Sequence, residues 1–276
     1  LWRPYADAVR GTVNGLAVGL PLTGADRLRG VGIGSGLGTE TAMDGIMVAV
    51  LGLGSGDHLR GLAVGGLGVG AGGQVGGILI GGLGAGAGDA ADGLLLGGLG
   101  AGAGGTSTGI LIGGLGAGAG EQARGLLLGG LGAGAGESVS GVLVAGLGAG
   151  AGDRMSGIGL SIGAVGAGDQ LSGIGIGGLG VGAGDAVTGL AVAGGGVGSS
   201  NLTGLTVAGG YTRVEEGRLR GVALSTWNDI RGSQRGLTIG LYNYTRELHG
   251  VQIGLLNVAR NNPVWARVLP LLNLNL

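Results

Sequence analysis

The chain has 276 residues and a formal net charge of −1, and 78 of its residues are glycine. The balance of 15 basic and 16 acidic residues gives no basic stripe, so we expect no nucleic-acid partner, and the absence of cysteine excludes disulfides and thiol catalysis. Glycine falls at every second position, as at Gly100, Gly102 and Gly104, which excludes the three-residue period of collagen. Because aromatic residues make up only 3%, any core must consist of small, closely packed side chains.

Residues 1–14 do not follow the pattern of the rest of the chain, and they contain the aromatic residues Trp2 and Tyr5. We predict that they form an N-terminal cap, because a stack of repeats must protect its open strand edge. The chain begins at Leu1 rather than at methionine. We interpret this start as the mature form of an exported protein.

A sixteen-residue repeat dominates residues 15–204. One unit reads G-L-L-L-G-G-L-G-A-G-A-G and is followed by four more polar residues. A short, fixed period without insertions predicts that neighbouring units stack in register. The leading glycines of successive units are Gly61, Gly77, Gly93, Gly109, Gly125, Gly141, Gly157, Gly173 and Gly189.

The first and third residues after each leading glycine are aliphatic, as in Leu94 and Leu96, whereas the residue between them varies, as in Ala63 and Gly159. This alternation is typical of a strand with one buried face. We therefore predict that the first and third residues face the core and that the variable residue faces outward. In five consecutive units the variable residue is leucine, which predicts an exposed leucine stripe of Leu79, Leu95, Leu111, Leu127 and Leu143.

The second half of each unit, such as 99–104, alternates between apolar residues and glycine and predicts a second short strand. A bend is expected between the strands, at the seventh position after the leading glycine. This position is Gly100, Gly116 or Gly132 in the central units and becomes Asn228, Asn243 or Asn257 in the last units. Glycine and asparagine both accept a left-handed backbone, and stacked asparagines can hydrogen-bond to one another.

The polar tetrapeptide of each unit, such as 89–92, predicts the second bend. Two strands and two bends close one coil, with parallel strands of successive coils about 4.8 Å apart. The predicted fold is therefore all-β, a single elongated β-solenoid of roughly 16-residue coils with N- and C-terminal caps. We divide the chain into an N-terminal cap (1–14), a glycine-, alanine- and leucine-rich array (15–204), and more polar closing coils with a C-terminal cap (205–276).

Few residues suggest site chemistry. The G-x-G-x-x-G strings are expected by chance in so glycine-rich a chain, and His58 and His249 lie far apart without catalytic partners. We expect no enzymatic activity, no cofactor and no metal site. An acidic column at the first tetrapeptide position can attract calcium, but solvated turns explain it better: Asp57, Asp89, Glu121, Glu137, Asp153, Asp169 and Asp185.

The closing coils contain a polar and aromatic cluster, which can form either a small sugar-binding surface or merely the polar outer face of these coils. We prefer the second interpretation. The cluster comprises Trp227, Asn228, Asp229, Tyr242 and Tyr244.

The last coils read G-L-T-I-G-L-Y-N (236–243) and G-V-Q-I-G-L-L-N (250–257), and the chain closes with L-P-L-L-N-L-N-L (269–276). This quarter of the chain resembles a group of bacterial exported surface-repeat proteins with tandem G-L-x-I-G-L-x-N units. The central coils depart from that motif, because glycine replaces asparagine at the bend. The resemblance implies a secreted or surface-attached β-repeat protein and brings no catalytic residues to carry over.

A contiguous apolar surface is rarely left in water, so we expect the leucine stripe to be covered by another copy of the chain. The predicted function is a non-enzymatic structural protein that self-assembles into an extracellular fibre or surface layer on a bacterial cell. One alternative is an outer-membrane β-barrel, with each repeat crossing the membrane as a tilted strand. Another is a flat-faced module that binds glycan or ice. The predicted self-association surface joins the leucine stripe to the glycine face of Gly100, Gly102, Gly104, Gly116 and Gly132.

Overall fold

The structure, a computed structural model, describes residues 9–20 and 22–275 and forms two compact units, Leu1–Gly136 (unit 1) and Glu137–Leu276 (unit 2). Trp2 and Tyr5 of the predicted N-terminal cap lie outside the described residues. The strands of unit 1 are β1 Val9–Gly19, β2 Thr23–Ser55, β3 His58–Gly65, β4 Gly68–Ala71, β5 Gln74–Gly81, β6 Gly84–Ala87, β7 Ala90–Gly97, β8 Gly100–Ala103, β9 Thr106–Gly113, β10 Gly116–Ala119, β11 Gln122–Gly129 and β12 Gly132–Ala135. The elements of unit 2 are β13 Ser138–Ala145, β14 Gly148–Ala151, β15 Arg154–Ser161, β16 Ala164–Ala167, β17 Gln170–Gly177, β18 Gly180–Ala183, β19 Ala186–Ala193, β20 Gly196–Ser199, β21 Asn201–Val214, β22 Arg218–Ile239, β23 Tyr242–Ala259, the 3₁₀ turn η1 Val264–Ala266, and β24 Val268–Asn275.

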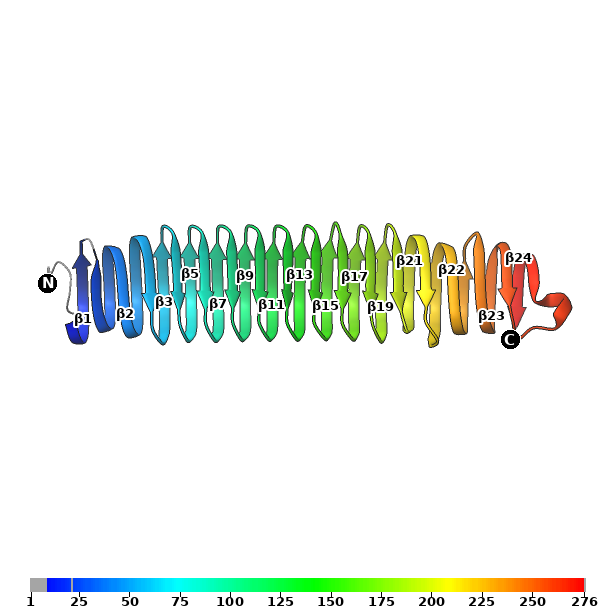
Figure 1. Cartoon of the computed structure of the whole chain (residues 1–276), viewed down its shortest axis with the longest axis horizontal. Helices are drawn as coiled ribbons and strands as arrows, with labels where there is room; N and C mark the ends of the chain where they lie inside the picture. The colour runs from blue at the N-terminus through cyan, green and yellow to red at the C-terminus, as the bar shows by residue number, and fades with distance from the viewer. Residues whose placement is uncertain (1–8, 21, 276) are drawn as a thin grey trace. The chain divides into compact units, whose positions relative to one another are not determined.

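Unit 1 is a stack of parallel coils, with a register of fifteen residues between β1 and β2 and of sixteen residues between β2 and the strands that follow. Strand β7 pairs in parallel with β5 and β9, so that Gly93 lies beside Gly77 and Gly109. Strand β8 pairs in the same way with β6 and β10, which places Gly100 beside Gly84 and Gly116. Each coil thus has a longer and a shorter strand, and the coils follow one another in a single row (Figure 1). The predicted β-solenoid is confirmed.

Unit 2 continues the same architecture in its own coils and then closes with a different pairing. Strands β13, β15, β17, β19 and β21 pair in parallel along one side of the coil. At the C-terminal end β24 pairs antiparallel with β23, with Val251 opposite Leu274. An antiparallel strand cannot start another coil in the same direction, so β24 ends the stack.

The predicted inward and outward faces of the longer strand are wrong. Leu94 and Leu96 are half-exposed and face outward, whereas Leu95 between them is fully buried. The leucine stripe is therefore core, with all its members at most 1% exposed: Leu79, Leu95, Leu111, Leu127 and Leu143. The physical reason is space, because the opposing shorter strand brings small residues such as Ala101 close, and the coil holds one large side chain between the strands.

Three inward positions in each coil share this limited core volume. In the coil of Ala91, Leu95 and Ala101 the middle leucine is flanked by two alanines, and in other coils a middle leucine is flanked by alanine together with serine or valine. Where the middle position is glycine the other two are large, as in the coil of Met155, Gly159 and Val165. A Cβ on Gly159 would lie 2.6 Å from Val165 Cγ1, closer than any packed contact. The core volume is thus balanced inside single coils.

The left-handed backbone conformation lies at the leading glycines, inside the longer strands, whereas the turn between the two strands lies at Gly98 and Leu99. Gly93 has φ +125°, and a Cβ there would collide with the carbonyl oxygen of Gly77 in the preceding coil. Gly100, where the bend was expected, is not among the residues with positive φ. Glycine is required at the leading position both for its backbone conformation and for the close approach of the coil beneath.

Asn228, Asn243 and Asn257 are buried in the core and do not occupy the bend. In β21 two residues separate Ala208 from Tyr211, whereas one residue separates their partners in β22, so the turn there is one residue shorter. This shortening moves the seventh residue inward, and Asn228 aligns with Thr212 of the preceding coil.

The predicted asparagine stack is confirmed. Asn228 Nδ2 donates to Asn243 Oδ1 at 2.8 Å, and Asn243 Nδ2 donates to Asn257 Oδ1 at 2.7 Å. Asn243 Nδ2 also donates to the backbone carbonyl of Ile253 at 2.9 Å. The side-chain amides therefore satisfy backbone carbonyls beside the shortened turns as well as one another.

Candidate functional site

Part of the outward surface of the longer strands in unit 1 is aliphatic, whereas exposed polar residues such as Arg60 and Asp92 stand just before the leading glycines. We call the first and third residues after each leading glycine the aliphatic face. All of them in unit 1 are leucine, isoleucine or valine, and parallel pairing places each residue beside its equivalent in the next coil, as with Ile78 and Leu94. Exposed fractions reach 65% at Leu16 and 42% at Ile78. The residues are Leu16, Val18, Val31, Ile33, Ile46, Val48, Leu62, Val64, Ile78, Ile80, Leu94, Leu96, Ile110, Ile112, Leu126 and Leu128.

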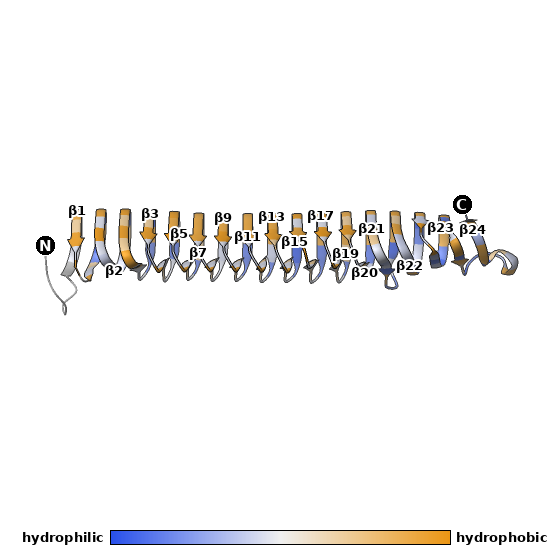
Figure 2. Cartoon of the chain, turned by 90° about the horizontal axis from the view of Figure 1, so that it is seen from above, coloured by the Kyte–Doolittle hydropathy of each residue, from blue (hydrophilic) through white to orange (hydrophobic). Residues whose placement is uncertain are grey.

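Unit 2 has an aliphatic face of the same kind. Val142 lies beside Ile158, and Ile176 beside Val192, in the registers of β13–β15 and β17–β19. Ile176 is 40% exposed. Coloured by hydropathy, the chain shows apolar residues recurring at the same place in successive coils (Figure 2).

A second apolar column is formed by leucines that lie in the turns between the longer and the shorter strands of unit 1. Its members are joined by backbone hydrogen bonds, with Leu99 N donating to Leu83 O at 2.7 Å. Each side chain is about half exposed, so these residues form a ridge next to the aliphatic face. We call this column the leucine ridge: Leu67, Leu83, Leu99, Leu115 and Leu131.

The predicted glycine surface lies on the shorter strands. Gly100, Gly102, Gly116 and Gly132 alternate with buried alanines and are half-exposed, and Gly104 lies in the following turn. The structure thus keeps these five glycines at the surface but separates them from the leucines predicted beside them. The exposed apolar surface is therefore the aliphatic face and not the leucine stripe. The sequence feature that marks this face is that its positions are always leucine, isoleucine or valine in unit 1.

Comparison with known proteins found no match. No protein-family model, curated protein or solved structure is similar to this chain. The residues that the structure describes include no helix with the length and hydrophobicity needed to cross a membrane.

The acidic column runs along the turns of successive coils and does not gather at one place. The residues of the acidic column are exposed and sit in turns stacked through their backbones, with Asp89 N donating to Gly73 O at 2.9 Å. Over residues 9–20 and 22–275, no three His, Cys, Asp or Glu side chains are grouped closely enough to hold a metal ion. His58 lies in unit 1 and His249 in unit 2.

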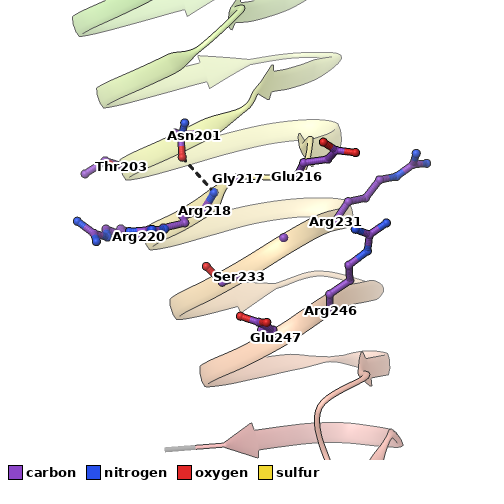
Figure 3. A pocket seen from close by; sticks show the side chains of 11 residues that line it. Asn201, Thr203, Glu216, Gly217, Arg218, Arg220, Arg231, Ser233, Arg246 and Glu247 are labelled. Atoms are coloured by element: carbon purple, nitrogen blue, oxygen red, sulfur yellow. Dashed lines mark hydrogen bonds between the residues drawn. The ribbon is translucent and has the colours of Figure 1, made fainter.

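A depression of about 660 Å³ in unit 2 is lined by arginines from successive coils. Figure 3 shows Arg231 and Arg246 extending on one side of the ribbon and Arg220 on the other. Arg231 is already paired, with its Nε 3.0 Å from Asp229 Oδ2, and Glu216 and Glu247 also line the depression. Because the guanidinium groups do not converge and acids lie among them, this depression does not form an anion site.

Proposed function

We propose that this protein is a non-enzymatic structural protein that assembles with further copies of itself through the aliphatic face. The observation that carries the proposal is the aliphatic face, whose positions repeat from coil to coil and hold no charged residue in unit 1. Apolar patches larger than a few hundred Å² on soluble proteins mark interaction sites. A regular face with one period can match the same face of a second copy along its length, so that affinity comes from many small contacts.

The resemblance of the last coils to exported bacterial surface-repeat proteins supports a place outside the cell or on its surface. The product of assembly would be a fibre or a surface layer. The leucine ridge would lie at the margin of the contact, where it can continue burial around the turn.

Electron microscopy of the purified full-length protein in buffer without detergent tests this proposal. We expect ordered assemblies from the wild type and dispersed particles from the double variant Ile78→Lys with Ile110→Lys, because lysines on the aliphatic face would have to be buried in the contact. The matched control is Gln74→Lys with Thr108→Lys, which adds the same charge to the same two coils outside the aliphatic face.

Two results would contradict the proposal. Monodisperse monomers of the wild type at high concentration would show that the aliphatic face needs no second copy. Precipitate that only detergent disperses would instead identify lipid as the cover of this face.

A further inference from the structure

Two exposed aromatic side chains stand at a step on the surface of unit 2. The outward column that begins with Gly180 and Gly196 on the shorter strands continues with Tyr211 and Trp227 in the following coils. Tyr211 is 53% exposed and Trp227 is 50% exposed. In this column, positions that have no side chain are followed by positions that carry large aromatic rings. We call the rise in the surface at Tyr211 and Trp227 the step.

The two rings lean away from each other although their residues are neighbours in register. The ring of Tyr211 lies over Gly196, where an added Cβ would come within 2.5 Å of the ring atoms Cε1 and Cζ. Trp227 leans the other way and packs on Tyr242, with ring centroids 4.2 Å apart. Each ring is thus held by its own support, and Gly196 fits because it has no side chain.

Both rings line one open depression of about 570 Å³, together with a small set of polar groups. Arg213 and Glu215 form an ion pair there, with Arg213 Nε 3.4 Å from Glu215 Oε1. Ser199 also lines the depression; it is 5% exposed, and its hydroxyl has no hydrogen-bond partner among the described residues. Ser199 lies in register with the fully buried Val214, so this hydroxyl faces the core and is not offered to a ligand.

The polar groups around the rings select the class of ligand. Both carboxylates of the lining are paired, Glu215 with Arg213 and Asp229 with Arg231, so no free cation is offered to the phosphates of a nucleic acid. Aromatic rings with a few polar groups suit a ligand that has an apolar face and a polar rim. A pyranose has this form, because its C–H groups can pack on a ring while its hydroxyls bond carboxylates and guanidinium groups.

We propose that the step of Tyr211, Trp227, Arg213, Glu215 and Asp229 binds a neutral polymer of hexopyranose sugars. The sugar rings of the polymer would pack against the side chains of Tyr211 and Trp227. This site lies in the column of the shorter strands β18 and β20, which β21 and β22 continue, whereas the proposed assembly uses the aliphatic face. The same protein would then assemble through one side of the coil and hold a glycan on the other.

Biolayer interferometry with the full-length protein immobilised on the sensor tests the proposal independently of self-assembly. The probes are laminarin, barley β-glucan, galactomannan and dextran, with a twenty-nucleotide oligothymidylate as the competing class. We expect at least one glycan to bind and the oligonucleotide not to bind. Trp227→Ala should weaken glycan binding about tenfold or more, whereas Trp265→Ala, at an 81% exposed position in η1, should leave it unchanged.

A glycine pair gives a second measurement that leaves both rings in place. Gly196→Ala should weaken glycan binding because the new methyl group displaces the Tyr211 ring. Gly180→Ala is the matched control in the same column, since its Cβ would meet nothing closer than 3.5 Å. Absence of binding to all four glycans overturns the proposal, as does equal or stronger binding of the oligonucleotide, or equal affinity of the Gly196→Ala and Gly180→Ala variants.

Discussion

Leu95→Lys is expected to unfold its coil, whereas Leu94→Lys, one residue earlier, should leave the fold intact. Leu95 is fully buried between the two strands, so a lysine there must either bury its ammonium group or force the strands apart. We expect a loss of about 4 kcal/mol or more of stability for Leu95→Lys, because an unpaired buried charge is among the most destabilising substitutions. Leu94 lies on the aliphatic face, where the lysine chain can reach water.

Thermal unfolding followed by circular dichroism, together with amide hydrogen exchange, separates the two variants. Leu95→Lys should lower the unfolding midpoint and remove protection in β7 and in the strands on either side of it. In a stack where each coil contacts only its neighbours, more distant coils should keep their protection. If Leu94→Lys proves the more destabilising variant, the assignment of inward and outward positions is reversed.

Asn243→Asp should be strongly destabilising at neutral pH and nearly tolerated in acid. Asn243 is fully buried, and its amide donates both to Asn257 Oδ1 and to the carbonyl of Ile253. An ionised carboxylate cannot donate to these oxygens, so it would face two acceptors without water, with a loss of roughly 3–5 kcal/mol. Burial would raise the pKa of the introduced carboxyl above its unfolded value of about 3.9.

The sign of the pH dependence follows from this raised pKa. Between the unfolded and the folded pKa the native state binds more protons, so stability is highest below about pH 4 and falls as pH rises. Unfolding midpoints of the variant and the wild type at acidic and neutral pH measure this loss. Asn201→Asp, at an exposed position of unit 2, is the control and should show little pH dependence. A pH-independent midpoint for Asn243→Asp would contradict the buried amide stack.

The fold could be predicted because its signals are local and repeated. The sixteen-residue spacing of leading glycines sets the register, and period-two alternation identifies the strands. The predicted hydrogen-bonded stack of asparagines was also correct, since identical residues one coil apart must face each other in any parallel arrangement.

The direction of the side chains could not be read from one strand alone. Constant aliphatic residues such as Leu94 and Leu96 were interpreted as core, but they lie on the outward surface of the strand. The signal that identifies the core is that side-chain volumes compensate each other within one coil. One coil combines the large Leu95 with the small Ala91, and another combines Gly159 with the large Met155. That comparison requires knowing which residues of the two strands face each other, and the sequence does not state this directly.

The position of the asparagines was wrong for a related reason. Counting from the leading glycine treats all coils as equally long, whereas the turn after Ser225 is one residue shorter than the turn after Ala208. A single missing residue shifts the alternation and turns the seventh side chain from outside to inside. Trp227 and Asp229 of the predicted polar cluster lie on either side of Asn228 and face outward, and only Asn228 enters the core.

The balance of core volume inside each coil also bears on how such a chain can change over generations. A substitution at one inward position can be corrected by another only a few residues away, without altering the coils above or below. Whole coils can therefore be copied or lost as complete units, because every new junction joins backbones that already share the same register. The coil is then the smallest unit that can be added or removed without disturbing the strand register, which is sixteen residues long in the central array.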